Sequence, residues 1–443
     1  FVSINNINSV IISYKLDRVL IYDQQNFDEE SLKSIKEKFY ITKTINTYNK
    51  NIKIGKEMQD LGIIENAALL IEDSVIKWFG KESDFNFNLD DSVNIIDACG
   101  YVIMPGFVDS HTHILFLKGR ENEFALRAKG FTYQQIAENG GGILSTVKDV
   151  RVSDKRQLKK STDKRLDEIL SLGTTTVEIK SGYGLNFKNE IKMLEAINEL
   201  NDENPIDIIP TFLGAHAIPN DTEKEKYIDE ICNNMIPYVA EKKLSRFCDV
   251  FCEKGYFSID DTKKILEKAK EFGLIPKLHA EELSYTGGVE LGCELNAISV
   301  DHLENISNAG IDILSKSDTI GVLLPGVSFY LNHKYAPGRQ LIDSGAKIAI
   351  SSDYNPGSCM TGNMQLIMTI AITQMHISIE EAICASTING AAALGVQNFV
   401  GSIEVGKKAD LVIYKINDYK SLPYHFGINH VYMVIKNGNV LQW

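Results

Sequence analysis

The chain has 443 residues, 44% of them hydrophobic, which is enough to bury a large catalytic domain and a smaller satellite domain. Its 46 Lys and Arg against 59 Asp and Glu give a net charge of -13, which argues against nucleic-acid binding because phosphates are held by clustered cations. No apolar run approaches the roughly 18 residues of a membrane span. The 7 cysteines lack a framework spacing and residues 1–22 lack a cleavage signal, so we expect a cytoplasmic protein.

The first hundred residues are expected to form short strands and turns, such as Ala67 to Ile71 (AALLI) and Ser74 to Phe79 (SVIKWF). A polar stretch at about 24–50, rich in Asn, Lys and Glu, is interpreted as a surface insertion. The pattern of turns and strands returns after Gly401. Residues 1–104 and 405–443 are therefore predicted to combine into one small β-sandwich domain.

Residues 105–404 have a different character, because apolar β-branched runs now alternate with helical patterns. Such alternation is typical of parallel strands joined by crossover helices. The strand candidates are Phe107–His111, Thr175–Lys180, Ile208–Gly214, Asp249–Cys252, Pro276–His279, Ala297–His302, Thr319–Leu324 and Lys347–Asp353. Eight parallel strands in a segment of this length predict a (β/α)8 TIM barrel.

Five histidines fall at the expected carboxyl ends of these strands, which form the active-site face of a TIM barrel. They are His111, His113, His216, His279 and His302. His111 and His113 form an HxH pair, and residues two apart in an extended segment point the same way. With His279 and with Asp353 at the end of the eighth strand, they are candidate ligands of one first-row divalent cation.

Glu282 lies three residues after His279 in the run HAEE, where the loop after the fifth strand begins. A carboxylate beside a metal can take a proton from water and pass it to a leaving nitrogen. Its neighbour Glu281 is interpreted as a solvated loop residue. A lone HxH pair is often structural, but histidines after the first, third, fifth and sixth strands together with Asp353 favour a catalytic site.

The run VIMPGFVDSHTH resembles the strand-one signature of the amidohydrolase superfamily, and HAEE, VDHLE and SSDYNPG stand where that superfamily keeps its other site residues. The segments GRENEFALRAKG, GGGILSTV, TTTVEIKSGYGL, TFLGAHAIP, DVFCEKGYF and SDYNPGS resemble the imidazolonepropionase family more closely, over roughly Gly55 to Tyr414. That family opens the cyclic amide of 4-imidazolone-5-propanoate to give N-formimino-L-glutamate in histidine degradation. Ser358 stands where many members have Thr and keeps the hydroxyl.

The resemblance implies one metal ion, zinc or iron, and attack on the ring carbonyl by hydroxide held on that metal. The implied metal ligands are His111, His113, His279 and Asp353. The implied catalytic residues are Glu282 as base, His302 beside the reacting carbonyl, and Asp353. The implied substrate-binding residues are Arg120 and Tyr183 for the carboxylate, His216 for the ring, Glu282, and Asn355, Gly357 and Ser358 for the glutamate portion. A homodimer is also expected from the resemblance.

Three alternatives are considered. A mononuclear aminohydrolase (deaminase) acting on a purine, pyrimidine or pterin-like heterocycle shares the HxH, HxxE, His and Asp pattern, but Arg120 and Tyr183 favour an anionic substrate. A binuclear cyclic amidase needs a bridging carbamylated lysine on the fourth strand, whereas Lys180 is on the second and Lys254 lies past the fourth. A non-catalytic barrel would be expected to lose some ligands. Cys248 and Cys252 are interpreted as packing residues rather than metal ligands.

Overall fold

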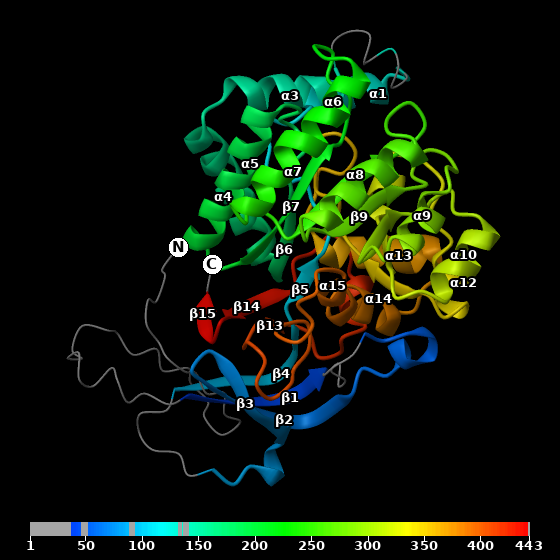
Figure 1. The fold of residues 1–443 in the computed structure, drawn as a ribbon. Helices are drawn as coiled ribbons and strands as arrows, with labels where there is room; N and C mark the ends of the chain where they lie inside the picture. Colours follow the sequence, from blue (N-terminus) through cyan, green and yellow to red (C-terminus); the bar gives the residue numbers. More distant parts are fainter. Residues whose placement is uncertain (1–36, 46–51, 88–93, 132–134, 136–140, 442–443) are drawn as a thin grey trace.

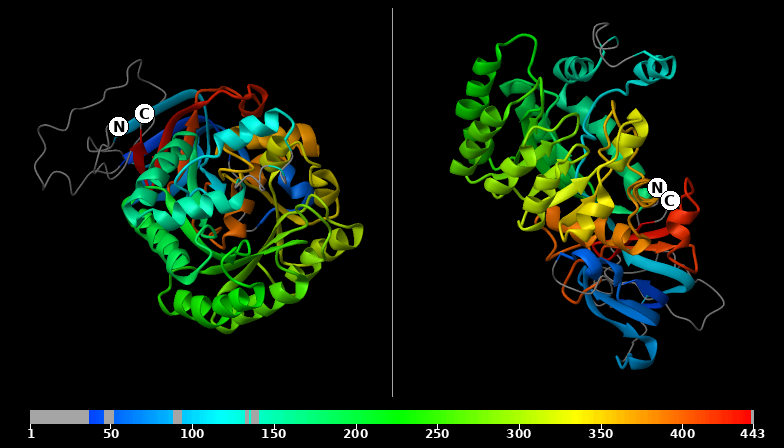
Figure 2. Two further views of the ribbon diagram at one scale, coloured as in Figure 1. Left: turned by 90° about the horizontal axis from the view of Figure 1, so that it is seen from above. Right: turned by 90° about the vertical axis from the view of Figure 1, so that its right-hand side faces the viewer.

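The structure, a computed structural model, describes residues 37–45, 52–87, 94–131, 135 and 141–441 (Figure 1). Within these residues the chain forms an eight-stranded parallel sheet and a seven-stranded sheet. In Figures 1 and 2 the seven-stranded sheet lies at one end of the barrel, and helix α1 (Glu121–Ala128) lies at the other end. No helix in the described part of the chain combines the length and the apolar character that crossing a membrane requires.

The eight-stranded sheet confirms the predicted barrel strands, with small differences at their ends. Its strands are β5 (Phe107–Asp109), β6 (Thr174–Lys180), β7 (Asp207–Ala215), β8 (Phe247–Cys252), β9 (Ile275–Ala280), β10 (Ser299–His302), β11 (Ile320–Leu323) and β12 (Lys347–Ile350). Each pairs in parallel with the next in chain order. Nearly all of their residues are buried, as expected for strands enclosed by helices.

The barrel closes between its first and last strands through the segments that carry the predicted ligands. Thr112 and Tyr354 form a parallel bridge just beyond β5 and β12. The N–H of Asp353 donates to the carbonyl of His111, and the N–H of His113 donates to the carbonyl of Tyr354, both at 3.0 Å. These bonds hold the HxH pair and Asp353 side by side, although they are far apart in the sequence.

Helices form a ring around the barrel strands, as the left view of Figure 2 shows. The helices following α1 are α3 (Ile143–Val152), α4 (Lys155–Ser171), α5 (Phe187–Glu203), α6 (Lys224–Glu230), α7 (Ile236–Glu241), α8 (Ile259–Glu271), α9 (Gly288–Glu294), α10 (Asn308–Ser315), α11 (Pro325–Leu331), α12 (Gly338–Asp343), α13 (Met364–Met375), α14 (Ile379–Ala385), α15 (Ile388–Ala393) and α16 (Ser421–Tyr424). Helix α8 is typical, because a capping box of Ser258 and Asp261 begins it. Its buried residues Thr262, Ile265, Leu266 and Ala269 follow the helical period, so one face packs on the sheet.

The smaller sheet combines strands from both ends of the chain in the order β15-β14-β13-β4-β1-β2-β3. The strands are β1 (Glu37–Ile45), β2 (Ile63–Glu72), β3 (Val75–Lys81), β4 (Ile95–Pro105), β13 (Leu411–Tyr414), β14 (Val431–Lys436) and β15 (Asn439–Leu441). Side chains from its two halves share one hydrophobic core, in which Leu69 and Ile71 of β2 join Ile413 of β13 and Ile435 of β14. The ends of the chain thus build one β domain together.

Strand β1 corrects the prediction of a surface insertion at 24–50. Residues Glu37–Ile45 of that segment pair antiparallel with β2 and parallel with β4, inside the sheet. The run EKFYITKTI contains the aromatic and β-branched residues typical of a strand, but its polar flanks obscured the pattern. Residues 24–36 and 46–50 lie outside the described residues.

Candidate metal and hydrolytic site

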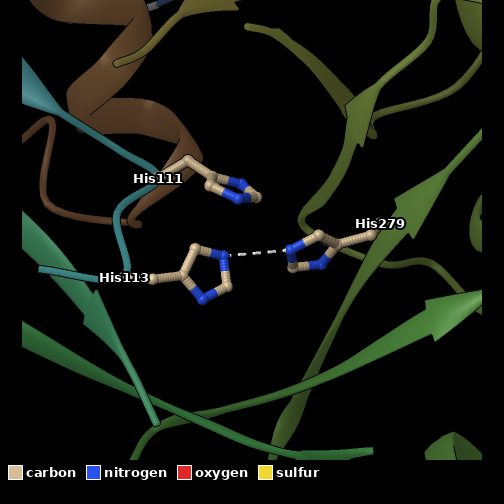
Figure 3. A group of neighbouring side chains, drawn as sticks. All are labelled: His111, His113 and His279. Atoms are coloured by element: carbon tan, nitrogen blue, oxygen red, sulfur yellow. Dashed lines mark hydrogen bonds between the residues drawn. The ribbon is translucent and has the colours of Figure 1, made fainter. Parts of the chain in front are cut away.

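The four predicted metal ligands converge at the carboxyl ends of the barrel strands. The Nε2 atoms of His113 and His279 lie 3.3 Å apart (Figure 3), and Asp353 Oδ1 lies 3.5 Å from Nε2 of both His111 and His113. Two ligands of a tetrahedral zinc ion, each about 2.0–2.1 Å from the metal, are about 3.3 Å apart. Among the described residues, His111 Nε2 and Asp353 Oδ1 are buried without a hydrogen-bond partner. The donor set and its spacing therefore fit a first-row divalent cation.

Two buried carboxylates fix the imidazoles behind this cluster. The Nδ1–H of His111 donates to Asp301 Oδ2 at 2.6 Å, and the Nδ1–H of His279 donates to Asp249 Oδ1 at 3.2 Å. An ionised carboxylate only accepts hydrogen bonds, so both imidazoles keep a lone pair on Nε2. Burial lowers the pKa of His279 to about 4 and that of His111 well below its usual range. Neutral imidazoles are the form that binds a metal.

Sequence reasoning missed Asp249 and Asp301. The available signal was their place within the strand runs FCDVFC and SVDH, where a charge is rarely buried without a partner. Burial likewise raises the pKa of Asp353, a candidate metal ligand, to about 8. A cation among the four ligands would reverse that shift, since it favours the ionised carboxylate.

Glu282 and His302 face each other beside the metal cluster. Glu282 Oε2 lies 3.5 Å from His302 Nε2, and Glu304 Oε2 lies 3.7 Å from His302 Nδ1. Burial raises the pKa of Glu282. Although burial opposes it, the carboxylates of Glu282 and Glu304 raise the pKa of His302 to about 10. The pair is therefore a half-buried carboxylate next to an imidazolium. His302 holds a left-handed φ of 87°, a strained conformation often found at functional sites.

A cavity of about 480 Å³ opens onto the cluster. Its lining includes every predicted substrate-binding residue, namely Arg120, Tyr183, His216, Glu282, Asn355, Gly357 and Ser358. It also includes residues that sequence reasoning did not select, among them Arg127, Phe251, Tyr256 and His333. The predicted substrate residues thus surround one space that also reaches His113, His279 and Asp353.

Arg120 precedes helix α1 and lies against the loop after β12. A Cβ built on Gly357 would lie 1.6 Å from Arg120 Nη2, so the guanidinium packs directly on the glycine backbone. Arg120 Nη1 lies 3.7 Å from Glu123 Oε2, and among the described residues its Nε has no hydrogen-bond partner. The side chain is 12% exposed, so this largely buried cation keeps donors available to a bound anion.

His216 and Tyr183 form an aromatic wall next to the candidate metal ligands. The His216 ring stacks on His113 with centroids 4.8 Å apart, and the Tyr183 ring lies 5.4 Å from His216. His216 Nδ1–H donates to the Gly182 carbonyl at 3.0 Å, and burial lowers the pKa of His216 to about 3. Its Nε2 is therefore a neutral hydrogen-bond acceptor. Gly182 has a φ of 106°, and a Cβ there would lie 2.8 Å from His216 Nδ1, so this position requires glycine.

Asn355 shapes the loop that carries Gly357 and Ser358. Its Nδ2 donates to the Asp353 carbonyl and to Ser358 Oγ, both at 2.7 Å. Its Oδ1 accepts from the N–H groups of Gly357 and Ser358, both at 2.8 Å. The Asn355 amide thus makes its hydrogen bonds within its own loop, and these bonds fix the part of the cavity wall that packs against Arg120.

The interpretation of Glu281 as a solvated residue is wrong. The side chain is fully buried and accepts N–H bonds from Gly287, Gly288 and Val289 at the start of α9, at 2.8–3.1 Å. These N–H groups have no partner within the helix, so a carboxylate there satisfies them. Glu281 thereby anchors the loop that positions Glu282.

The lysines and cysteines considered above for other kinds of metal site lie where the sequence predicts. Lys180 is on β6 and Lys254 lies past the end of β8, while Cys248 and Cys252 are buried in β8.

Comparisons with known proteins agree with this geometry. The sequence model of the amidohydrolase family matches residues 102–441. Curated relatives named imidazolonepropionase include those of Thermoanaerobacter pseudethanolicus, 47% identical over 86% of this chain and 92% of the relative, and Porphyromonas gingivalis, 43% identical over 90% and 98%. The chain belongs to the imidazolonepropionases of the amidohydrolase family. Solved structures with the same fold include an Escherichia coli guanine deaminase (TM-score 0.70, 16% identity, 92% of this chain and 99% of the other) and a zinc-bound adenosine deaminase from Xanthomonas campestris (TM-score 0.69, 16%, 92% of both chains).

Proposed function

We propose that this protein hydrolyses the cyclic amide of 4-imidazolone-5-propanoate to N-formimino-L-glutamate, a step of histidine degradation. The observation that carries the proposal is one cavity that holds both a guanidinium, from Arg120, and a buried His and Asp donor cluster. An anion-binding group and a hydrolytic centre in the same space suit a small ring with a carboxylate tail. The relatives that share 43–47% of the sequence support the same substrate.

We propose that one metal ion, zinc or iron, is held by His111, His113, His279 and Asp353. When bound, such an ion lowers the pKa of water from about 15.7 to roughly 7 and polarises a carbonyl, so that hydrolysis can run at neutral pH. The zinc in the Xanthomonas campestris neighbour supports this choice. Lys180 is engaged by Asp249 and Glu178 in the barrel interior, which supports one metal rather than a lysine-bridged pair.

Glu282 is proposed as the group that moves the proton. Its raised pKa makes it a stronger base than an ordinary glutamate. It takes a proton from the attacking water and delivers it to the ring nitrogen as the C–N bond breaks and the carbonyl carbon becomes a carboxylate. His302, with its pKa of about 10, is cationic at neutral pH and stabilises the negative charge that develops on the carbonyl oxygen.

The remaining cavity residues are proposed to hold the substrate. Arg120 takes the carboxylate tail in a charge-assisted bond worth about 1.5–3 kcal/mol. Tyr183 also faces the tail, and the neutral His216 accepts a hydrogen bond from a ring N–H. The loop from Asn355 to Ser358 closes the tail end of the site.

A deaminase is the nearest competing function, since it shares the metal cluster and the fold. An ultraviolet assay on freshly generated 4-imidazolone-5-propanoate, run beside a panel of aminopurines and hydantoins, separates the two. We expect turnover of the imidazolone without release of ammonia. Ammonia release from an aminopurine at a higher kcat/KM would contradict the proposal.

A further inference from the structure

A buried ammonium lies directly behind the metal ligands. Lys180, the last residue of β6, is fully buried inside the barrel. Its Nζ lies 2.7 Å from Asp249 Oδ2, 2.8 Å from Glu178 Oε2 and 3.5 Å from Asp301 Oδ2. These carboxylates come from β6, β8 and β10, so one cation joins three strands of the barrel.

Two of these carboxylates are the ones that hold the metal-binding imidazoles. Asp301 accepts from His111 at 2.6 Å, and Asp249 accepts from His279 at 3.2 Å. At Asp249 the imidazole donates to Oδ1 and the ammonium lies against Oδ2, whereas at Asp301 the imidazole and the ammonium both lie against Oδ2. Lys180 is the described cation that lies within ion-pair distance of both aspartates.

The ammonium also fills a place that would suit a second cation. Ligand atoms of His111, Glu178 and Asp301 lie within 4.8 Å of one another, which is close enough to bind a metal. Lys180 Nζ lies against two of these three residues. Without it, three buried carboxylates would face one another with only Lys277, which pairs with Glu178, as a described counter-charge. Buried carboxylates of this kind repel one another, so they would be expected to move apart without the ammonium.

We propose that Lys180 is a positioning residue of the metal site, a built-in cation whose contacts with Asp249 and Asp301 keep their carboxylates aimed at His279 and His111. The inference rests on the metal site of the proposed function. An ionised aspartate holds the imidazole in the tautomer that offers Nε2, and it raises the basicity of that nitrogen. Loss of the ammonium should therefore weaken metal binding even though Lys180 lies outside the ligand set.

The test compares Lys180→Met with Lys277→Met. Lys277 is an equally buried lysine that also pairs with Glu178, at 2.7 Å, but among the described residues it lies within ion-pair distance of neither aspartate. The metal-free proteins are titrated with cobalt(II) against a competing chelator, and the visible absorption of the bound cobalt is recorded. Far-ultraviolet circular dichroism and cooperative thermal unfolding check that each variant folds.

Loss of a group that orients metal ligands typically costs about 10- to 100-fold in metal affinity, so we expect a rise of that size in the cobalt Kd of Lys180→Met, together with an altered cobalt spectrum. Lys277→Met should change the Kd by less than about 3-fold, since it leaves the ligand-orienting contacts in place. A folded Lys180→Met with wild-type Kd and spectrum, or an equal loss in Lys277→Met, overturns the inference but leaves the proposed function standing. Failure of the wild type to bind cobalt would overturn both.

If Lys180→Met does not fold, Lys180→Gln takes its place, because glutamine keeps an N–H donor and removes the charge. Its cobalt Kd is expected to rise by the same factor. If neither variant folds, even in the presence of metal, Lys180 serves the stability of the barrel and the inference is wrong.

Discussion

Gly357→Ala is expected to disable substrate binding by moving Arg120. The new Cβ would lie 1.6 Å from Arg120 Nη2, whereas non-bonded atoms of this kind approach to about 3.5 Å. The guanidinium must therefore move by about 2 Å. Gly357 does not have a positive φ, so its backbone conformation suits alanine and the variant should fold.

The size of the effect follows from the contact that is lost. A charge-assisted hydrogen bond to a carboxylate contributes about 1.5–3 kcal/mol, so kcat/KM should fall by about 10- to 150-fold. Metal content should stay at the wild-type level, because the atoms nearest to a Cβ at Gly357 belong to Arg120 and not to the proposed metal ligands. On an imidazolone that lacks the propionate, the variant should match the wild type, since Arg120 has no tail to bind.

The assay is a double-mutant cycle with Arg120→Met, read as kcat/KM in the ultraviolet assay, with elemental analysis of the metal. If Gly357→Ala acts through Arg120, it should add less than about 3-fold to the loss already caused by Arg120→Met, because coupled substitutions are not additive. Fully additive losses would refute the reasoning. So would an equal loss on the substrate without the tail.

Three further predictions concern the groups around the metal cluster. Glu282→Gln should keep the metal and lower kcat by about 10²–10⁴-fold. Burial raises the pKa of Glu282, so the acidic limb of the wild-type pH profile should lie above the usual glutamate range, and in the variant this limb should move or vanish. Normal turnover of the variant would mean that another group takes the proton. In the metal-free protein, His216 should cost stability as the pH falls below 6.5, because its pKa is about 3 when folded and it binds a proton more readily when unfolded. Urea unfolding of the wild type and of His216→Asn at pH 7 and pH 5 isolates this contribution, since Asp353 and His302, whose raised pKa values act in the opposite direction, are common to both proteins. The wild type should lose about 2 kcal/mol more than the variant between the two pH values, and an equal loss in both would argue against it. Glu281→Ala should destabilise the protein by about 1.5–3 kcal/mol in urea unfolding, since buried N–H groups at the start of α9 lose a charged acceptor, whereas a solvated residue would leave the unfolding midpoint unchanged.

The barrel and the convergence of the candidate metal ligands could be predicted from the sequence because both follow from local pattern and topology. Apolar β-branched runs alternating with helical runs specify parallel strands, and the carboxyl ends of such strands always gather on one face. Histidines and an aspartate at those ends must therefore meet. The HxH pair and Asp353 needed no knowledge of packing beyond this rule.

The tertiary structure decided which groups surround the ligands. Asp301 is 190 residues from His111 and Lys180 is 69 residues from Asp249, so no local pattern links these partners. Glu281 and Glu282 are neighbours in sequence, and Glu281 has a left-handed φ of 56°. The Glu281 carboxylate binds the N–H groups at the start of α9, whereas the Glu282 side chain lines the cavity. Strand β1 likewise shows its role only through pairing with β2 and β4. Burial and partners, which depend on contacts between distant segments, determine what each charged side chain does.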